Sequence, residues 1–276
     1  MMKIIDSHVH IWTRADEYPW AAEEQDVPSM DAHPDDLIEL MKKNGVDRAV
    51  LVQYIKYRWD NRYVAQVLRA YPSVFIGVCR VDPENPDSPD RLSYWTEACG
   101  FRGVRIGQLP NTRRNWFTNP LFVPLFKRAA ALKVPVFILT VPDHLNDLAQ
   151  ILERVPDVNV VVDHLADCIN QHDDRLNKLL ALAKYPRLFL KLGHIAQNSS
   201  ESFPWRDTHG SLEKIFKNFG AERIMWGSDW PFCLSHMTYA QSLAYVLEGV
   251  NFLTPADQEW VLSKTALQIW HQAACF

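Results

Sequence analysis

The chain has 276 residues, of which 47% are hydrophobic and 22% are charged, so it is long enough to bury a large core. Its 29 basic and 33 acidic residues give a formal net charge of -4 and are spread along the sequence, which argues against a nucleic-acid partner. No apolar run reaches the length of a membrane span and the first ten residues lack a signal-peptide pattern, so we expect a cytoplasmic protein with no membrane partner.

Eight short apolar segments follow one another along the chain, separated by stretches with helical spacing. The predicted strands are 3–9, 48–53, 74–78, 101–106, 134–139, 158–162, 188–192 and 223–226. The predicted helices are 35–44, 61–71, 88–99, 119–132, 144–155, 173–184 and 208–218, with two more in 237–272. Consecutive apolar positions, as in Val-Val-Val-Asp, are typical of strands buried on both faces of a parallel sheet. The pattern predicts an α/β fold, a single (β/α)8 TIM barrel in which residues 1–276 form one domain, with an open doubly wound sheet as the alternative.

The longest predicted connection, 11–34, carries Trp12, Tyr18 and Trp20. Because loops after barrel strands lie on the catalytic face, we expect this segment to fold over the barrel mouth.

Polar side chains stand at the predicted ends of three strands. His8 and His10 end the first strand, and the period of two puts both imidazoles on the same side. His164 ends the sixth strand and Asp229 follows the eighth. A histidine pair at one strand end is also compatible with simple backbone capping. Four such residues in one mouth favour a functional cluster, because burying them without partners or a metal is costly.

These motifs are similar to those of a known family. The segments Ile-Asp-Ser-His-Val-His, Val-Asp-His-Leu and Trp-Gly-Ser-Asp-Trp-Pro resemble the amidohydrolase superfamily, in particular its amidohydrolase-related branch of sugar-acid lactonases and 2-pyrone-4,6-dicarboxylate hydrolases. The resemblance extends over nearly the whole chain and includes Gly103-Val104-Arg105 and Leu190-Lys191-Leu192.

The resemblance implies roles for the four strand-end residues. Asp229 would activate the attacking water, while His8, His10 and His164 would polarise the substrate carbonyl or bind a metal. Members with two metals carry a carboxylated lysine after the fourth strand, where this chain has Arg105. The resemblance therefore implies at most one divalent ion, zinc, on His8, His10, His164 and Asp229, or a reaction that needs no metal.

Other polar or aromatic residues near predicted strand ends are candidates for substrate binding. They are Arg105, Arg80, Gln53, Tyr54, Trp230 and His194. An arginine in the mouth can grip a carboxylate or pair with a mouth carboxylate, and the two roles stay open for Arg105. Lys191 can form a Schiff base or pair with a buried acid, and no role is assigned to it or to His144.

Several catalytic patterns are absent from the sequence. It contains no G-x-S-x-G elbow, no Walker loop and no G-x-G-x-x-G motif, and its five cysteines form no C-x-x-C pair. The favoured function is hydrolysis of a lactone, a small-molecule substrate, in a protein that could form homo-oligomers. The alternatives are a zinc-dependent decarboxylase or hydratase of a small carboxylic acid, and a barrel that binds a small molecule without catalysis.

Overall fold

The computed structural model describes residues 2–107, 116–170 and 173–271, and contains an eight-stranded parallel sheet in the order β1 to β8. The strands are β1 (Ile5–Val9), β2 (Arg48–Val52), β3 (Phe75–Arg80), β4 (Val104–Gly107), β5 (Val136–Leu139), β6 (Val160–Val162), β7 (Leu188–Leu192) and β8 (Ile224–Trp226). Each differs from its predicted range by at most three residues at either end. The sequence therefore located all eight strands, because a strand buried on both faces is apolar throughout.

The sheet curves until its last strand meets its first. An isolated parallel bridge joins Val9 to Trp230 just beyond β8. The backbone N–H of Asp229 donates to the carbonyl of His8 at 2.9 Å, and that of His10 donates to the carbonyl of Trp230 at 2.7 Å. These bonds complete a (β/α)8 TIM barrel, so the fold prediction is confirmed and the open sheet is excluded.

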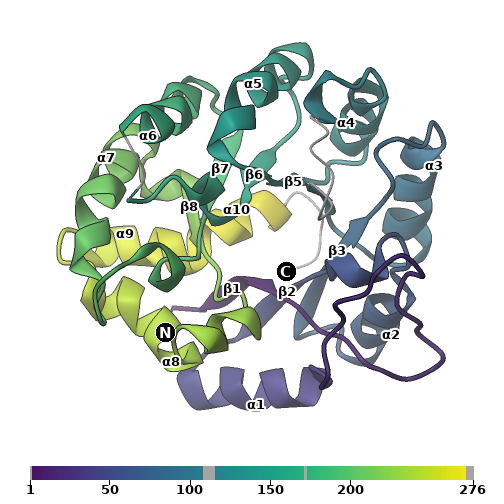
Figure 1. Ribbon diagram of the computed structural model, residues 1–276, viewed down its shortest axis with the longest axis horizontal. Helices are drawn as coiled ribbons and strands as arrows, with labels where there is room; N and C mark the ends of the chain where they lie inside the picture. The colour runs from purple at the N-terminus through teal and green to yellow at the C-terminus, as the bar shows by residue number, and fades with distance from the viewer. Residues whose placement is uncertain (1, 108–115, 171–172, 272–276) are drawn as a thin grey trace.

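Most of the helices form an outer ring around the strands (Figure 1). The helices are α1 (Pro34–Asn44), α2 (Arg62–Ala70), α3 (Ser88–Ser93), α4 (Phe122–Ala131), α5 (Leu145–Arg154), α6 (Asp173–Leu180), α7 (His209–Phe219), α8 (Tyr239–Ala244), α9 (Pro255–Glu259) and α10 (Thr265–His271). Turns of π-helix continue α3, α8 and α9, so 239–249 and 255–271 are the two C-terminal helical stretches that the sequence predicts. Thr254 caps α9 in a reciprocal capping box with Asp257.

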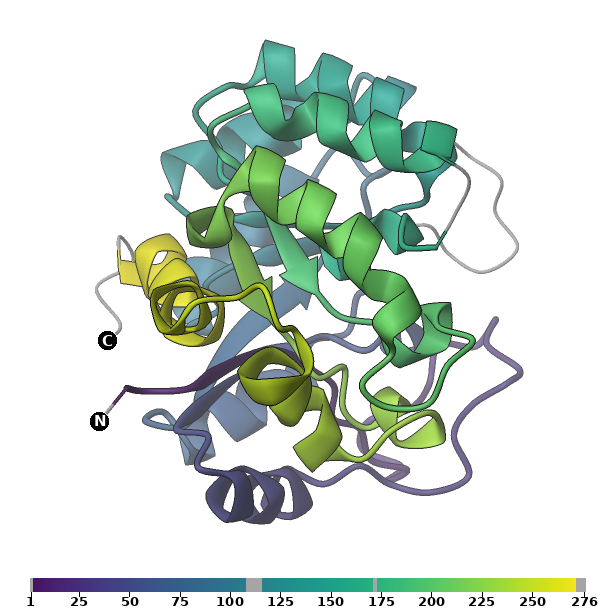
Figure 2. The ribbon, with the colours of Figure 1, turned by 90° about the vertical axis from the view of Figure 1, so that its left-hand side faces the viewer.

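The barrel interior is apolar at the end where the strands begin. Val50, Val78, Phe137 and Met225 are fully buried there, together with side chains of α10. The indole of Trp270 stacks on Phe137 with ring centroids 5.8 Å apart and an interplanar angle of 15°. Figure 2 shows α10 lying across this end of the barrel, which it closes. The polar site lies at the opposite end.

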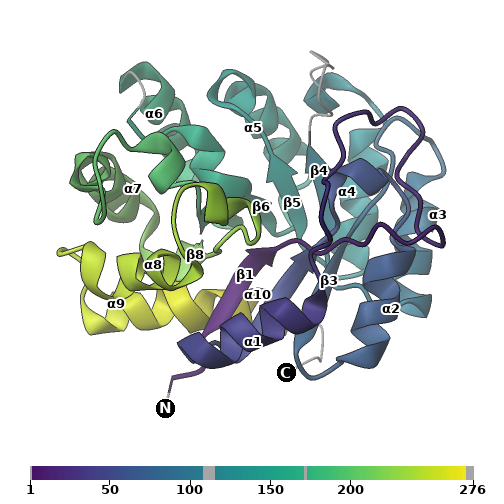
Figure 3. The same cartoon turned by 60° about the horizontal axis from the view of Figure 1, so that its bottom comes forward.

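The long loop between β1 and α1 lies at the ends of the strands, as predicted (Figure 3). The Trp12 ring lies 4.6 Å from that of Tyr54 and 5.4 Å from that of Phe232. Trp20 stacks on Tyr57 with centroids 4.5 Å apart. These aromatic contacts fix the loop against the segments that follow β2 and β8.

Two further observations concern the part of the chain that the structure describes. Within it, no helix is both long and apolar enough to cross a membrane. Cys79, Cys99, Cys168 and Cys233 are free thiols, in agreement with the absence of a paired-cysteine motif, and Cys275 lies outside the described residues.

Candidate functional site

A bulge in β1 directs two histidines into the barrel. Asp6 and Val9 of β1 pair with Ala49 and Leu51 of β2, so three steps along one strand match two along the other. His8 lies within the shifted stretch and His10 beyond it, and both point inward, with their Nε2 atoms 3.1 Å apart. Both rings are almost completely buried.

His164 enters the site through an unusual turn after β6. Its φ is 51°, and the next three residues through Asp167 also have φ between 51° and 54°. Four consecutive left-handed residues without glycine are strained, and such strain is typical of functional sites. The ring of His164 then lies so close to Gly193 that a Cβ there would be 2.6 Å from Nδ1 of His164.

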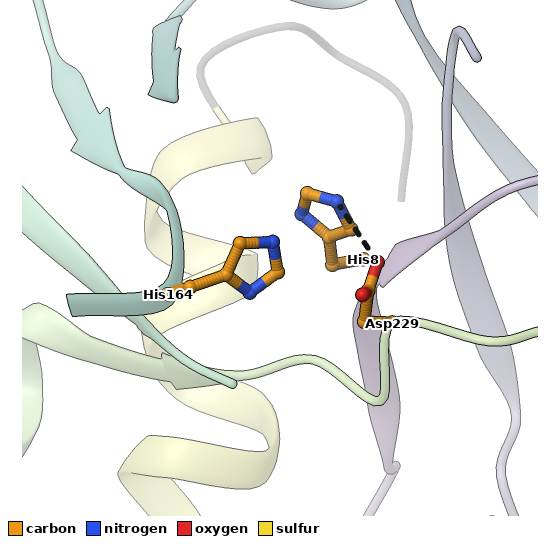
Figure 4. A group of neighbouring side chains, drawn as sticks. All are labelled: His8, His164 and Asp229. Atoms are coloured by element: carbon orange, nitrogen blue, oxygen red, sulfur yellow. Dashed lines mark ion pairs between the residues drawn. The ribbon is translucent and has the colours of Figure 1, made fainter. Parts of the chain in front are cut away.

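Asp229 follows β8 with a φ of 60°, which turns its carboxylate back over the barrel. Figure 4 shows the side chains of His8, His164 and Asp229 pointing toward one another. Each of the three offers a ligand atom within 4.8 Å of the others, and all three residues are buried. This group can hold a metal ion.

A cavity of about 410 Å³ opens above these residues. Among the predicted site residues, its walls include His10, Tyr54, Arg105, His164, His194 and Asp229. A cavity of this size accommodates a small molecule.

Three predicted binding residues are buried away from the cavity walls. The amide of Gln53 donates to the carbonyl of Asp60 at 2.6 Å, which holds it below the loop after β2. Trp230 is 4% exposed and lies in the bridge that joins β8 to β1. Arg80 is fully buried, and the Cζ of its guanidinium lies 5.3 Å from the ring centroid of Trp59.

A chain of hydrogen bonds determines which nitrogens of His8 and His10 carry hydrogen. The amine of Lys191 lies 2.8 Å from Nδ1 of His8 and, when charged, can only donate to it. His8 therefore carries its hydrogen on Nε2. Nδ1 of His10 lies 2.7 Å from the carbonyl of Val52, which can only accept, so the Nε2 of His10 has a lone pair. The contact between the two Nε2 atoms is then a hydrogen bond from His8 to His10.

Asp163 contacts three of the side chains that surround these hydrogen bonds. Its Oδ2 accepts from Nε of Arg105 at 2.9 Å, and its Oδ1 lies 3.4 Å from both Lys191 and Nδ1 of His8. Burial alone would raise the pKa of Asp163, but Lys191, His8 and Arg105 hold it well below its usual range. Burial and the neighbouring Lys191 lower the pKa of His8 to about 3, so His8 is neutral.

A second series of hydrogen bonds positions the carboxylate of Asp229. Its Oδ2 lies 3.1 Å from Nε2 of His194, whose Nδ1 lies 3.0 Å from Asp167. Burial alone would lower the pKa of His194, but Asp167 and Asp229 raise it to about 9, so this ring is protonated at neutral pH. Its ring stacks on that of His164 with centroids 3.6 Å apart. Burial alone would raise the pKa of Asp229, but the protonated ring of His194, whose Nε2 donates to Oδ2, keeps it well below its usual value.

Sequence reasoning missed two carboxylates among these hydrogen-bonded residues. Asp163 precedes His164 in the Val-Asp-His motif. It stands two residues after Val161, whose side chain points into the barrel, so the alternation of a strand could have placed Asp163 inside as well. Asp167 has no such signal, because only the left-handed turn brings it to His194. Lys191 pairs with Asp163, the second of its two proposed roles. His144 ends a short 3-10 turn before α5 and is not among the wall residues of the cavity.

Comparison with known proteins places the chain among named enzymes. The family model described as Amidohydrolase (Amidohydro_2) matches residues 5–272. The L-fucono-1,5-lactonase of Burkholderia ambifaria is 28% identical over 232 residues, which cover 82% of this chain and 80% of that protein. The 4-sulfomuconolactone hydrolase of Rhizobium radiobacter is 23% identical over 82% of this chain and 75% of its own length.

Solved structures share the same barrel. A Pseudomonas putida protein, named provisionally as a 2-pyrone-4,6-dicarboxylic acid hydrolase, superposes with a TM-score of 0.81 at 22% identity and 98% coverage of both chains. A Burkholderia multivorans amidohydrolase with bound zinc gives a TM-score of 0.77 at 24% identity, covering 98% of this chain and 99% of that one. At sequence identities of 22% and 24%, this structural similarity shows that the fold is shared.

Proposed function

Because the chain belongs to the amidohydrolase family, whose model spans residues 5–272, we propose that it is a hydrolase that opens a lactone with water activated by Asp229. One observation carries the proposal. Asp229 is buried and ionised on the cavity wall, with its Oδ1 3.4 Å from Nε2 of His10 and 3.6 Å from Nε2 of His8. The lactonase relative at 28% identity supports an ester ring as the substrate.

Asp229 acts as the general base. It takes a proton from water as the water oxygen attacks the lactone carbonyl carbon. The bond from that carbon to the ring oxygen then breaks, and Asp229 returns the proton to the departing oxygen. The product is the open hydroxy acid. His194 keeps the carboxylate ionised and correctly oriented through its contact with Oδ2.

The histidines stabilise the negative charge that develops on the carbonyl oxygen. His8 carries a hydrogen on Nε2, and the carbonyl oxygen of a bound substrate can accept it in place of His10, while His164 contributes from the opposite side of the site. His10 is neutral with its lone pair facing Asp229, so it serves best by accepting a hydrogen bond from the attacking water. Arg105 and Tyr54 on the cavity wall bind the rest of the substrate.

A single zinc ion is compatible with the donor set. His8, His164 and Asp229 would hold it, and Nδ1 of His164 is a buried nitrogen with no hydrogen-bond partner in the described part of the chain. Bound there, zinc would supply Lewis-acid polarisation of the carbonyl. The ammonium of Lys191 beside His8 opposes this use, because it keeps the His8 hydrogen on the nitrogen that would face the metal. We therefore propose a reaction that proceeds without an obligatory metal.

The remaining proposals come from the sequence. Residues 1–276 form one domain, the partner is a small molecule, and a cytoplasmic location and a homo-oligomer stay predictions. A zinc-dependent decarboxylase or hydratase and a non-catalytic binding barrel are the competing outcomes of the test below.

The test is a pH-indicator assay on a panel of 1,4- and 1,5-lactones of sugar acids, before and after dialysis against dipicolinate, with metal analysis of both samples. We expect acid release from at least one lactone that survives dialysis. If dialysis removed one equivalent of zinc together with the activity, and added zinc restored the activity, the metal-free reaction would be contradicted. Stoichiometric zinc with release of carbon dioxide from a carboxylic acid, and no lactone turnover, would favour the decarboxylase.

A further inference from the structure

Asp6 is a fully buried carboxylate on β1, two residues before His8. Its Oδ1 accepts from the backbone N–H of His8 at 3.2 Å and from the backbone N–H of Ser228 at 2.9 Å. One oxygen therefore bridges β1 and the segment that follows β8. The other oxygen, Oδ2, is buried near the hydroxyl of Tyr239 and takes no part in this bridge. Burying a carboxylate is costly, so the position of Asp6 calls for a reason beyond packing.

The bond to His8 holds the bulge in β1. Between Asp6 and Val9 the strand has one residue more than the matching part of β2. A bulge interrupts the ladder of backbone hydrogen bonds, and buried N–H groups need an acceptor. Asp6 supplies an acceptor from within its own strand, two residues before the N–H that it binds. The bulge that directs the His8 ring inward is thus fixed by the Asp6 side chain.

The bond to Ser228 acts where β8 has ended. The strand stops at Trp226, so Ser228 lies beyond it and directly precedes Asp229. The bond to Asp6 therefore continues the contact between the first and last strands past the end of β8. The next N–H, that of Asp229, donates to the carbonyl of His8 at 2.9 Å, and its backbone then turns with a φ of 60°. Asp6 thus fixes the chain immediately before the turn that directs the carboxylate of Asp229.

The two backbones lie in close contact beside this bridge. The hydroxyl of Ser7 donates to the carbonyl of Trp226. A Cβ at Gly227 would lie 2.6 Å from Cβ of His8, so only glycine allows the chain after β8 to approach His8 this closely. A small shift of either backbone would therefore change the distance between Nε2 of His8 and Oδ1 of Asp229, which is 3.6 Å (Figure 4).

We propose that Asp6 is a positioning residue for catalysis, which sets the distance between His8 and Asp229 by holding both backbones on one carboxylate oxygen. The inference rests on the proposed lactone hydrolysis, because turnover is its main readout. Asp6 is not among the wall residues of the cavity, so it acts through His8 and Asp229 and not by binding substrate. A misplaced base slows the chemical step, whereas contacts that bind the rest of the substrate are kept.

Steady-state kinetics of Asp6→Ala and Asp6→Asn, on a lactone that the wild type hydrolyses, test the inference. Asp6→Ala removes the acceptor of both N–H groups, so kcat should fall about 10- to 100-fold while KM changes little. Asp6→Asn keeps an oxygen that can accept from both groups, so most of kcat should be retained. A residue that only stabilised the fold would leave kcat of the folded enzyme unchanged.

Thr265→Val is the matched control. Thr265 is also fully buried, and its hydroxyl donates to the carbonyl of Ala221 at 3.2 Å, but it lies on α10 at the opposite end of the barrel. This variant should lose stability and keep the wild-type kcat. If Asp6→Ala does not fold, Asp6→Ser takes its place. A serine hydroxyl can accept from the N–H two residues later, but it is one bond shorter than the carboxylate and would not hold Ser228 as well, so kcat should still fall.

Hydrogen exchange of the Ser228 and Asp229 amides, followed by NMR in the same variants, needs no substrate. Both amides should exchange faster in Asp6→Ala than in Asp6→Asn or Thr265→Val. A wild-type kcat in Asp6→Ala, or an equal loss of kcat in Asp6→Asn, would overturn the inference. If lactones are hydrolysed but these exchange rates are equal, only this inference fails. If no lactone is hydrolysed, the proposed function fails, and the exchange rates alone decide whether Asp6 holds the two backbones.

Discussion

The amine of Lys191 lies 2.8 Å from Nδ1 of His8, so a cation from β7 faces an imidazole from β1 inside the barrel. Burial lowers the pKa of Lys191 to about 8, yet the amine remains largely charged at neutral pH because Asp163 lies 3.4 Å away. A charged amine has no lone pair, so it keeps the His8 hydrogen on Nε2. Lys191 is thus a positioning residue that prepares His8 to donate toward a substrate oxygen.

Lys191→Met should lower kcat/KM about 10- to 100-fold, the range observed when a partner that orients a site histidine is removed. Without the amine, His8 can move its hydrogen to Nδ1 and donate to Asp163, 3.4 Å away, which leaves a lone pair on Nε2. The variant should therefore also bind zinc more tightly. Steady-state kinetics, zinc titration and nitrogen NMR of the His8 ring would check this.

Lys178→Met is the control for Lys191→Met, because Lys178 lies on the outer helix α6 and pairs only loosely with Asp143, at 3.5 Å. It should behave as the wild type. Unchanged kinetics and an unchanged His8 tautomer in Lys191→Met would contradict the positioning role.

The fold could be predicted because it depends on local patterns. Strand segments such as Val160–Val162 are apolar at every position, and helices are marked by signals such as Pro34 at the start of α1 and Gly45 after its end. The clustering of His8, His164 and Asp229 followed from the same reasoning, because barrel strands end at one face.

The finer geometry of the site could not be predicted, because it depends on departures from regular backbone. Strand parity points Asp163 inward and would point His164 outward, but the left-handed turn brings His164 inside as well. The bulge in β1 has a similar effect for His8. Nor does any local signal show that the guanidinium of Arg80 has no hydrogen-bond partner among the described residues, since that depends on how distant acids are shared.

Asp229→Asn should lower kcat about 10²- to 10⁴-fold, the usual contribution of a general base. Asparagine has nearly the same shape, so the fold should persist. The change removes one of the two carboxylates that raise the pKa of His194, which should therefore fall from about 9 toward the ordinary value of 6.5. Kinetics and an NMR titration of His194 would measure both effects.

Asp167→Asn is the companion variant, since it removes the other carboxylate of His194 without touching the base. It should lower the pKa of His194 while losing much less activity than Asp229→Asn. Equal losses of kcat in the two variants would show that Asp229 acts through His194 rather than on water.

The stability of the protein should decrease on the alkaline side because of His194. Its folded pKa of about 9 lies above the ordinary 6.5, so its charged form is stabilised by folding. This contribution is complete below about pH 6.5 and disappears as the pH rises through 9, and it amounts to at most about 3 kcal/mol. Urea unfolding of the wild type and of His194→Gln from pH 6 to 10 should show two curves that converge at high pH. A constant difference between them would contradict this assignment.

Gly193→Ala should disturb catalysis without adding or removing a polar group. A Cβ at this position would lie 2.6 Å from Nδ1 of His164, far inside contact distance, so the imidazole or the backbone after β7 must move. Because site residues must be held within about 0.5 Å of their working positions, we expect kcat/KM to fall about 10- to 100-fold with little change in circular dichroism.

Gly210→Ala provides the comparison, since a Cβ there, in the first turn of α7, meets nothing within 4 Å. That variant should keep full activity and gain a few tenths to about 1 kcal/mol of stability. If Gly193→Ala were as active as Gly210→Ala, the close packing of His164 against the β7 backbone would have no part in its function.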